Sequence, residues 1–183
     1  VKKKIQNLRG NMTNSAPLMY NIKALARDIR EISQDYIQTE NQSVISRWFH
    51  SPKMDMFIWQ DEDKNIIKQQ LSFYGLIIEW NLVDGIRTGM LVEEEPSEDN
   101  IEGSEIIRFD KTINDYALKQ SIEILDAIDS MNTLEKKRLV NNFTNSPTLD
   151  TMSSEEILEK YSYLRAKPRN IWRFFKKIFF NKS

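Results

Sequence analysis

The sequence predicts an α+β domain in which an antiparallel β meander of three to five strands is flanked by an N-terminal helix and several C-terminal helices. Residues 46–94 divide into strand-like segments separated by turn-forming residues, and apolar residues on either side of this region recur with helical spacing. The length of 183 residues fits a single domain. We assign residues 15–165 to that domain and expect residues 1–14, which are largely polar and basic, to form a mobile arm.

The N-terminal helix is predicted over residues 15–39. Ser15-Ala16-Pro17 offers an N-cap followed by an early proline, which is typical of a helix start. Apolar residues then follow at alternating four- and three-residue steps: Leu18, Ile22, Leu25, Ile29, Ile32 and Tyr36. This stripe favours a helix laid across the sheet. The alternative is a seam that joins two copies of the chain in a homodimer, although fewer than three heptads are present.

The meander is predicted from short apolar and aromatic segments. Residues 55–59 favour a strand, residues 61–64 a polar turn, and residues 66–83 a long second arm. Gly75 interrupts that arm, where we expect a bulge or a bend. After an acidic loop, residues 106–109 favour one further strand.

The turn after the long arm sets the register of the next strand pair. Asp84-Gly85 has the form of a two-residue hairpin turn. Such a turn would place Val83 opposite Ile86 and Trp80 opposite Gly89. A large ring that faces a strand glycine covers otherwise exposed backbone, so this register is physically consistent.

Three helices are predicted after the sheet, over residues 110–130, 133–145 and 153–165. Asp110 can cap the first, and the other two open with sequences of the capping-box form. Pro147 separates the second helix from the third, because proline cannot continue a helix. The expected arrangement therefore places helices on one face of the sheet.

Part of the sheet region resembles a group of small uncharacterised bacterial proteins. These proteins share an Arg-Trp-Phe-His lead-in and an Asp-Leu-Phe-Val-Trp-like strand. The matching segments here are Arg47-Trp48-Phe49-His50, Asp55-Met56-Phe57-Ile58-Trp59, Gln70-Leu71 and Glu79-Trp80, with Met56 where leucine is expected. The resemblance covers roughly residues 46–80 and implies the sheet. It implies no activity, because that group has none assigned.

Composition excludes several kinds of chemistry. Without cysteine the chain has no disulfide, no thiolate nucleophile and no cysteine-ligated metal. The five glycines form none of the phosphate-binding motifs, and the single histidine, His50, excludes a two-histidine metal site. We therefore predict no metal and no cofactor. No apolar run approaches the length of a membrane span, so we expect a cytoplasmic protein, with the inner membrane face as the alternative location.

Charge is segregated along the chain although its net value is −1. Seven acidic residues and no basic ones lie between 93 and 105, whereas seven basic residues and no acidic ones lie between 165 and 183. A near-neutral total, with few basic residues among the sheet aromatics, argues against nucleic-acid binding.

One cluster could support catalysis. Arg47, His50 and Asp55 would meet if the first strand pairs with the second, and an imidazole beside a carboxylate can transfer protons near neutral pH. The alternative is a structural Arg–Asp pair at a sheet corner, with His50 half exposed. We regard an enzyme that uses these three residues as the second functional hypothesis.

The segment 169–180 gives the strongest functional signal. On a helix its apolar residues would lie on one side and its basic residues on the other. The set comprises Arg169, Ile171, Trp172, Arg173, Phe174, Phe175, Lys176, Lys177, Ile178 and Phe179. An aromatic-rich apolar side with a purely basic polar side is typical of a helix that lies in a membrane interface. The leading hypothesis is therefore a non-catalytic binding or adaptor protein that uses this segment on an anionic membrane or a protein partner. The competing interpretation packs the same helix on its own domain.

Overall fold

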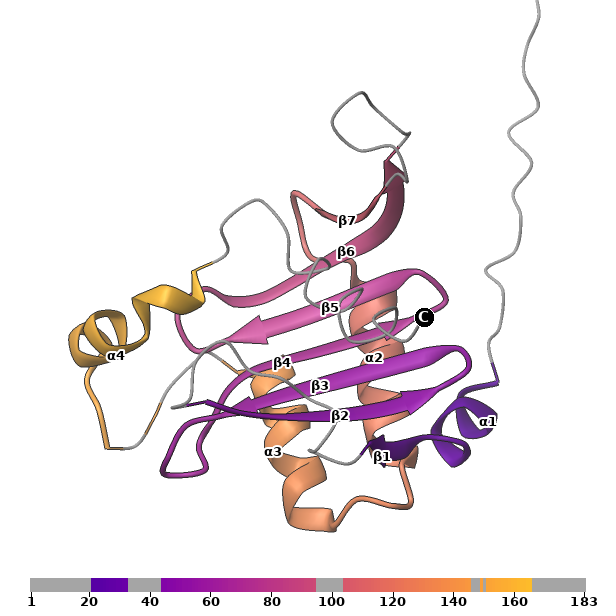
Figure 1. Cartoon of the computed structure of the whole chain (residues 1–183), viewed down its shortest axis with the longest axis horizontal. Helices are drawn as coiled ribbons and strands as arrows, with labels where there is room; N and C mark the ends of the chain where they lie inside the picture. The colour runs from indigo at the N-terminus through magenta and orange to yellow at the C-terminus, as the bar shows by residue number, and fades with distance from the viewer. Residues whose placement is uncertain (1–20, 33–43, 95–103, 146–148, 150, 166–183) are drawn as a thin grey trace, which may run out of the picture.

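The computed structural model describes residues 21–32, 44–94, 104–145, 149 and 151–165 (Figure 1). In chain order the elements are α1 (Ile22–Arg27), β1 (Arg30–Ile32), β2 (Ile45–Ser51), β3 (Met54–Gln60), β4 (Ile66–Phe73), β5 (Leu76–Asn81), β6 (Gly85–Glu94), β7 (Ser104–Phe109), α2 (Asp115–Ala127), α3 (Thr133–Thr144), α4 (Ser154–Tyr161) and the 3₁₀ helix η2 (Ser162–Leu164). In this part of the chain the seven strands form one antiparallel sheet in the order β1 to β7. The predicted α+β class with an antiparallel sheet is confirmed, whereas three to five strands were too few.

One missing strand came from the long arm predicted over residues 66–83. Tyr74 and Gly75 both have positive φ angles, +48° and +79°, and Phe73 pairs directly with Leu76. Two consecutive residues with positive φ form the type I′ turn that suits a two-residue hairpin. Gly75 therefore ends one strand and opens the next, and the predicted bulge or bend is wrong. A tyrosine in the left-handed region is rare, which is why its residue type does not predict this turn.

The predicted register across the next turn is also wrong. Asn81 pairs with Gly85, so the loop holds three residues rather than two. The Asn81 side-chain oxygen accepts hydrogen bonds from the backbone N–H groups of Val83 and Asp84, at 3.0 and 2.7 Å. This Asx turn folds the loop locally, and Gly85 supplies the positive φ of +74° that closes it.

The register shift gives Gly89 a different neighbour. Trp80 pairs with Ile86, and Ile77 lies opposite Gly89. A β-carbon at Gly89 would lie 2.6 Å from the backbone oxygen of Arg108 in β7. The close approach of two backbones therefore requires glycine here, rather than the covering ring expected from the sequence.

The N-terminal helix is much shorter than predicted. In the described residues α1 ends at Arg27, and the chain then forms the edge strand β1, in which Arg30 pairs with His50 of β2. The free edge of β2 can offer backbone hydrogen bonds that compete with helix formation, and tertiary pairing outweighs a weak helical propensity. Leu25 and Ile29 of the predicted stripe are buried in the core of their own domain. Leu18 and Tyr36 lie outside the described residues, so the homodimer stays a prediction.

The three later helices begin at the expected types of cap. Asn132 accepts from the Glu135 N–H at the start of α3, and Ser153 with Glu156 forms a complete capping box at α4. For α2 the cap is Asn114, not Asp110. Asp110 instead accepts a 2.6 Å hydrogen bond from the Thr88 hydroxyl of β6.

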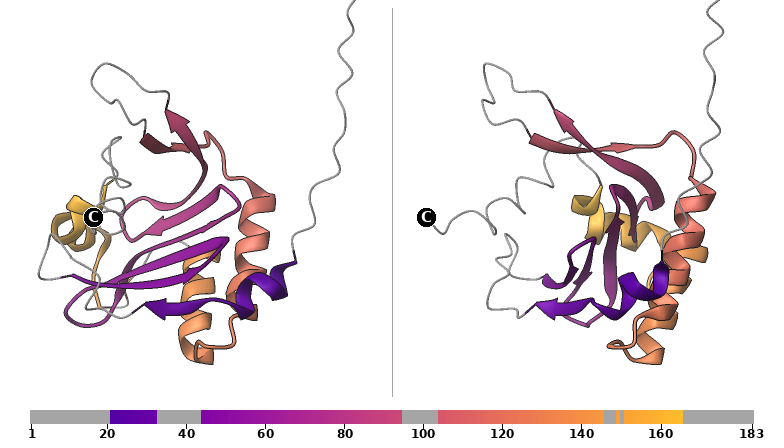
Figure 2. Two further views of the ribbon diagram at one scale, coloured as in Figure 1. Left: turned by 45° about the vertical axis from the view of Figure 1, so that its right-hand side comes forward. Right: turned by 90° about the vertical axis from the view of Figure 1, so that its right-hand side faces the viewer.

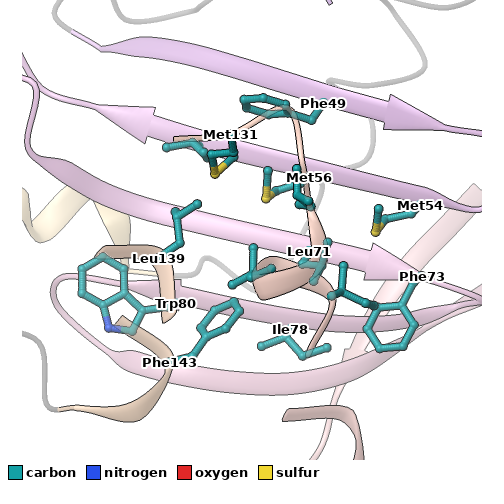
Figure 3. Packing of buried hydrophobic residues seen from close by; sticks show 14 of the residues in the cluster. Phe49, Met54, Met56, Leu71, Phe73, Ile78, Trp80, Met131, Leu139 and Phe143 are labelled. Atoms are coloured by element: carbon teal, nitrogen blue, oxygen red, sulfur yellow. The ribbon is translucent and has the colours of Figure 1, made fainter. Parts of the chain in front are cut away.

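The core lies between one face of the sheet and the helices, and we call this sheet face the inner face. In the side view of Figure 2, α2 and α3 lie along one side of the sheet. Figure 3 shows inner-face side chains from four neighbouring strands meeting residues of the helical region. The buried cluster includes Phe49, Met54, Met56, Ile58, Ile67, Leu71, Phe73, Ile78 and Trp80 from the strands, and Leu25, Ile124, Leu139, Phe143, Ile157 and Tyr161 from the four described helices. Of the described helices, α2 and α3 thus lie along one face of the sheet.

A buried carboxylate ties α4 to the turn between β3 and β4. Tyr161 donates a 2.7 Å hydrogen bond from its hydroxyl to Asp61, and Asn65 donates to the same carboxylate from its backbone and its side chain. Burial raises the pKa of Asp61, but these hydrogen bonds and the charge of Lys160 together outweigh burial and lower the pKa below its ordinary value.

Acid is therefore expected to remove the stability that Asp61 provides. Its pKa is lower in the folded chain than the unfolded value of about 3.9, so the contribution is fully present above that pH and is lost as pH falls through the folded pKa. Urea unfolding of the natural chain and of Asp61→Asn at pH 7, 4 and 3 checks this. The gap in unfolding free energy should shrink towards pH 3, and a constant gap would contradict the assignment.

Candidate functional site

The sheet face turned away from the core carries an unusual set of side chains, and we call it the outer face. Because side chains alternate along each strand, the residues between the inner-face positions point to this side. They are Ser46, Trp48, His50, Asp55, Phe57, Trp59, Lys68, Gln70, Ser72, Ile77, Glu79, Asn81 and Arg87, with Phe109 on β7. None of the described helices contributes to this face (Figure 2).

The outer-face residues line up in rows across the strands. One row joins Trp48, Phe57, Gln70, Glu79 and Arg87, each directly opposite the next. It runs from aromatic rings on β2 and β3 to charged groups on β5 and β6. The local sequence produces this layout because aromatic residues alternate in β3, and polar residues alternate in β4 and β5.

Three aromatic rings form one end of the face. The rings of Trp48 and Phe57 stack with centroids 5.8 Å apart and an interplanar angle of 10°. The rings of Phe57 and Trp59 lie 5.8 Å apart at a tilt of 32°. Trp48 and Phe57 are buried, at 5% and 8% exposure, although they do not belong to the helix-covered cluster. This end therefore holds a second group of buried apolar side chains.

An ion-paired triad forms the other end of the face. Glu79 is fully buried and lies between two cations. The Lys68 ammonium is 3.0 Å from one carboxylate oxygen, and the Arg87 guanidinium donates to the other. Each cation also lies over an aromatic ring, Lys68 at 5.1 Å from the Trp59 centroid and Arg87 at 4.0 Å from the Phe109 centroid. The charges of this triad are thus largely satisfied by one another.

Three buried polar atoms of this face have no hydrogen-bond partner among the described residues: the side-chain oxygen of Gln70, Oε2 of Glu79 and Nε of Arg87. Oε2 of Glu79 nevertheless lies 3.0 Å from the Lys68 ammonium, which leaves the acceptor on Gln70 and the donor on Arg87 unpaired. Buried polar groups in native structures are nearly always hydrogen-bonded. These two unpaired atoms therefore favour contact with a further group. The group that meets Gln70 must be a hydrogen-bond donor.

The structure separates the predicted catalytic residues. His50 Nδ1 lies 2.7 Å from Asp55 Oδ1 on the outer face, and Asp55 also accepts a 2.9 Å hydrogen bond from Trp48 Nε1. Arg47 lies on the opposite side of β2, where it pairs with Glu31 and Glu135. The hydrogen bond to Glu31 raises the pKa of Arg47 above its ordinary value, because it favours the charged form. Arg47 is therefore a link between β1, β2 and α3 and not a neighbour of His50.

Sequence reasoning missed the Lys68–Glu79–Arg87 triad altogether. A usable signal was present, because Lys68 and Gln70 are spaced by two, as are Glu79 and Asn81. Polar residues at every second position of a strand mark one face. The residues of the 169–180 segment lie outside the described part of the chain.

The described residues contain no group of three or more His, Asp or Glu side chains that could hold a metal ion. No helix among them is long and apolar enough to cross a bilayer.

Comparison with known proteins returned no relative: no family model, no curated protein and no solved structure matches this chain. The resemblance over residues 46–80 stays a prediction. The function of this chain is therefore inferred from its own residues.

Proposed function

We propose that this chain is a non-catalytic binding protein that associates with an anionic membrane surface through residues 169–180. The observation that carries the proposal is the division of this segment into one aromatic-rich apolar side and one basic side. Each Lys or Arg close to an anionic surface contributes about 1 kcal/mol, and the inserted rings add to this. Several basic residues together with six apolar ones support reversible binding. A protein groove that accepts the same helix is the competing partner.

The path of the described chain supports access to a surface. Arg165, the last described residue, is exposed, and its Nε lies 3.9 Å from the Asp84 carboxylate at the turn between β5 and β6. Only residues 166–168 separate it from the segment. The described chain therefore ends at the surface of the domain, with three residues between its end and the segment.

Vesicle flotation tests the proposal, and the chain offers a matched pair of variants. Phe175 lies on the apolar side of the segment, whereas Phe180 falls outside the apolar arc. We expect the full chain to float with anionic vesicles, less in high salt, and not with neutral ones. Phe175→Ser should reduce binding much more than Phe180→Ser. Absence of flotation, or equal flotation with neutral vesicles, would overturn the proposal and turn the search towards a protein partner.

A second candidate function is supported by the short His50–Asp55 contact. Such a pair can move protons, and it lies at an accessible edge of the outer face, since the His50 side chain is 41% exposed. No substrate class follows from it. If a catalytic activity is found, His50→Ala should abolish it, and unchanged turnover would exclude this pair.

A further inference from the structure

We propose that residues 169–180 dock with their apolar side on the outer face of the sheet of the same chain when no membrane is present. The domain would then hold its own membrane-binding segment, and vesicles would compete with the sheet for the same rings. The competition between vesicles and the sheet rests on the proposed membrane function, whereas the docking on the sheet does not.

The outer face has the chemistry of a covered surface. Trp48, Phe57 and Ile77 are buried, yet the helix-covered cluster does not include them. In the described part of the chain, α2 and α3 lie along the inner face, and α4 lies at one end of the sheet. A face that buries aromatic and aliphatic side chains away from the core fits an apolar occupant.

The charges of the outer face do not select a charged occupant. Lys68 and Arg87 both pair with Glu79, so the triad leaves little charge for a ligand to neutralise. The unpartnered acceptor of Gln70 instead needs an N–H donor. Residues 169–180 include Trp172 and Asn170, whose side chains carry such donors. The basic side of the segment would face solvent.

The reach of the chain fits this docking. The last described residue lies beside Asp84, at the end of the sheet where Lys68 pairs with Asn81 on the outer face. Five strands, β2 to β6, span about 19 Å at roughly 4.8 Å per strand. A helix over residues 169–180 would be about 18 Å long. A helix over the segment would therefore be as long as the face is wide, and Arg165, four residues before it, lies at one end of that face.

Other segments outside the described residues fit the outer face less well. Residues 33–43 contain two apolar residues and residues 95–103 contain one. Residues 1–20 carry Val1, Ile5, Leu8 and Met12 at helical spacing, but their only aromatic residue is Tyr20. Residues 169–180 carry an apolar side long enough to cover the rings of this face.

The absence of cysteine allows a direct test by disulfide formation in the full chain. Ser72 lies in the middle of the outer face, between Asp55 and Ile77. A cysteine at this position can therefore report whether the segment lies on the face. We expect Ser72→Cys/Phe175→Cys to form an intramolecular disulfide under mild oxidation at low protein concentration. The matched control is Lys137→Cys/Phe175→Cys, because Lys137 is exposed on α3, on the other side of the sheet. The control should form no such bond.

The outcomes separate docking from membrane binding. Equal disulfide formation in both variants, none in either, or only disulfide-linked dimers would overturn intramolecular docking. The dimers would point to a second copy as the occupant. The oxidised Ser72→Cys/Phe175→Cys chain should lose flotation and regain it on reduction, as competition requires. A disulfide without flotation of the reduced chain would leave docking in place and overturn the membrane function, and flotation without a disulfide would do the reverse.

Discussion

Replacing Glu79 with alanine is expected to lower the free energy of unfolding by about 3–5 kcal/mol, because it leaves buried charges without a partner. Glu79 is fully buried between Lys68 and Arg87, and Lys68 is itself only 9% exposed. Without the carboxylate, two cations of like charge remain close together. Urea unfolding at neutral pH measures the loss.

Two further variants locate the cause of that loss. Glu159→Ala, at an exposed position of α4, should change stability by no more than about 0.5 kcal/mol. Replacing the whole triad by apolar residues, as Lys68→Met/Glu79→Leu/Arg87→Met, should recover most of the stability, because a buried ion-pair cluster and a well-packed apolar one are often equivalent. A loss below about 1 kcal/mol in Glu79→Ala would show that the two cations reach water without it.

Phe143→Ala is expected to cost about 3–5 kcal/mol, since it removes a buried ring and leaves a cavity under α3. Phe143 is 3% exposed and belongs to the cluster between α3 and the sheet (Figure 3). One turn earlier, Gln69 of β4 donates a 2.9 Å hydrogen bond to the backbone oxygen of Leu139 and accepts one from Asn142. These bonds hold α3 in place, so the helix cannot move inwards to fill the space. Thermal unfolding followed by circular dichroism measures the effect.

Leu134 provides the control on the same helix. Its side chain is 62% exposed, so Leu134→Ala should be nearly neutral. If Phe143→Ala cost no more than Leu134→Ala, the contact of α3 with the sheet would contribute little to the stability of the domain.

Local signals predicted the elements whose residues decide their own conformation. The strand around residues 55–59, the polar turn that follows it, and the caps Asn132 and Ser153 all lie where their residue types require. The strand number could not be predicted, because one hairpin depends on Tyr74 adopting a positive φ that its type disfavours. The register beyond Asn81 depends on the Asn81 side chain, which accepts hydrogen bonds from its own loop. These bonds favour a three-residue loop, whereas an Asp-Gly pair is typical of a two-residue loop. The helix predicted from the N-terminal stripe ends early because residues 30–32 pair with β2, and that pairing is a tertiary effect.

At the candidate site, the separation of Arg47 from His50 could have been predicted from the sequence. Arg47 and His50 are three positions apart, and a strand of period two places such residues on opposite faces. The assignment of that segment to a strand would have separated them and left His50 with Asp55. The ion pairs of Glu79 with Lys68 and Arg87 could not be predicted in the same way, because they depend on the register of β4, β5 and β6.

The meander also sets an order of events during synthesis. Each strand pairs with its neighbour in sequence, so the hairpins close over short loops and the sheet has low contact order. Its inner face, however, is completed by Phe143 and Leu139, which follow Trp80 by about 60 residues. At roughly 5–20 residues per second, the ribosome needs about 3–13 s to supply them. During that interval the nascent sheet exposes an apolar surface, and a chaperone that binds apolar segments can reach it before the helices do.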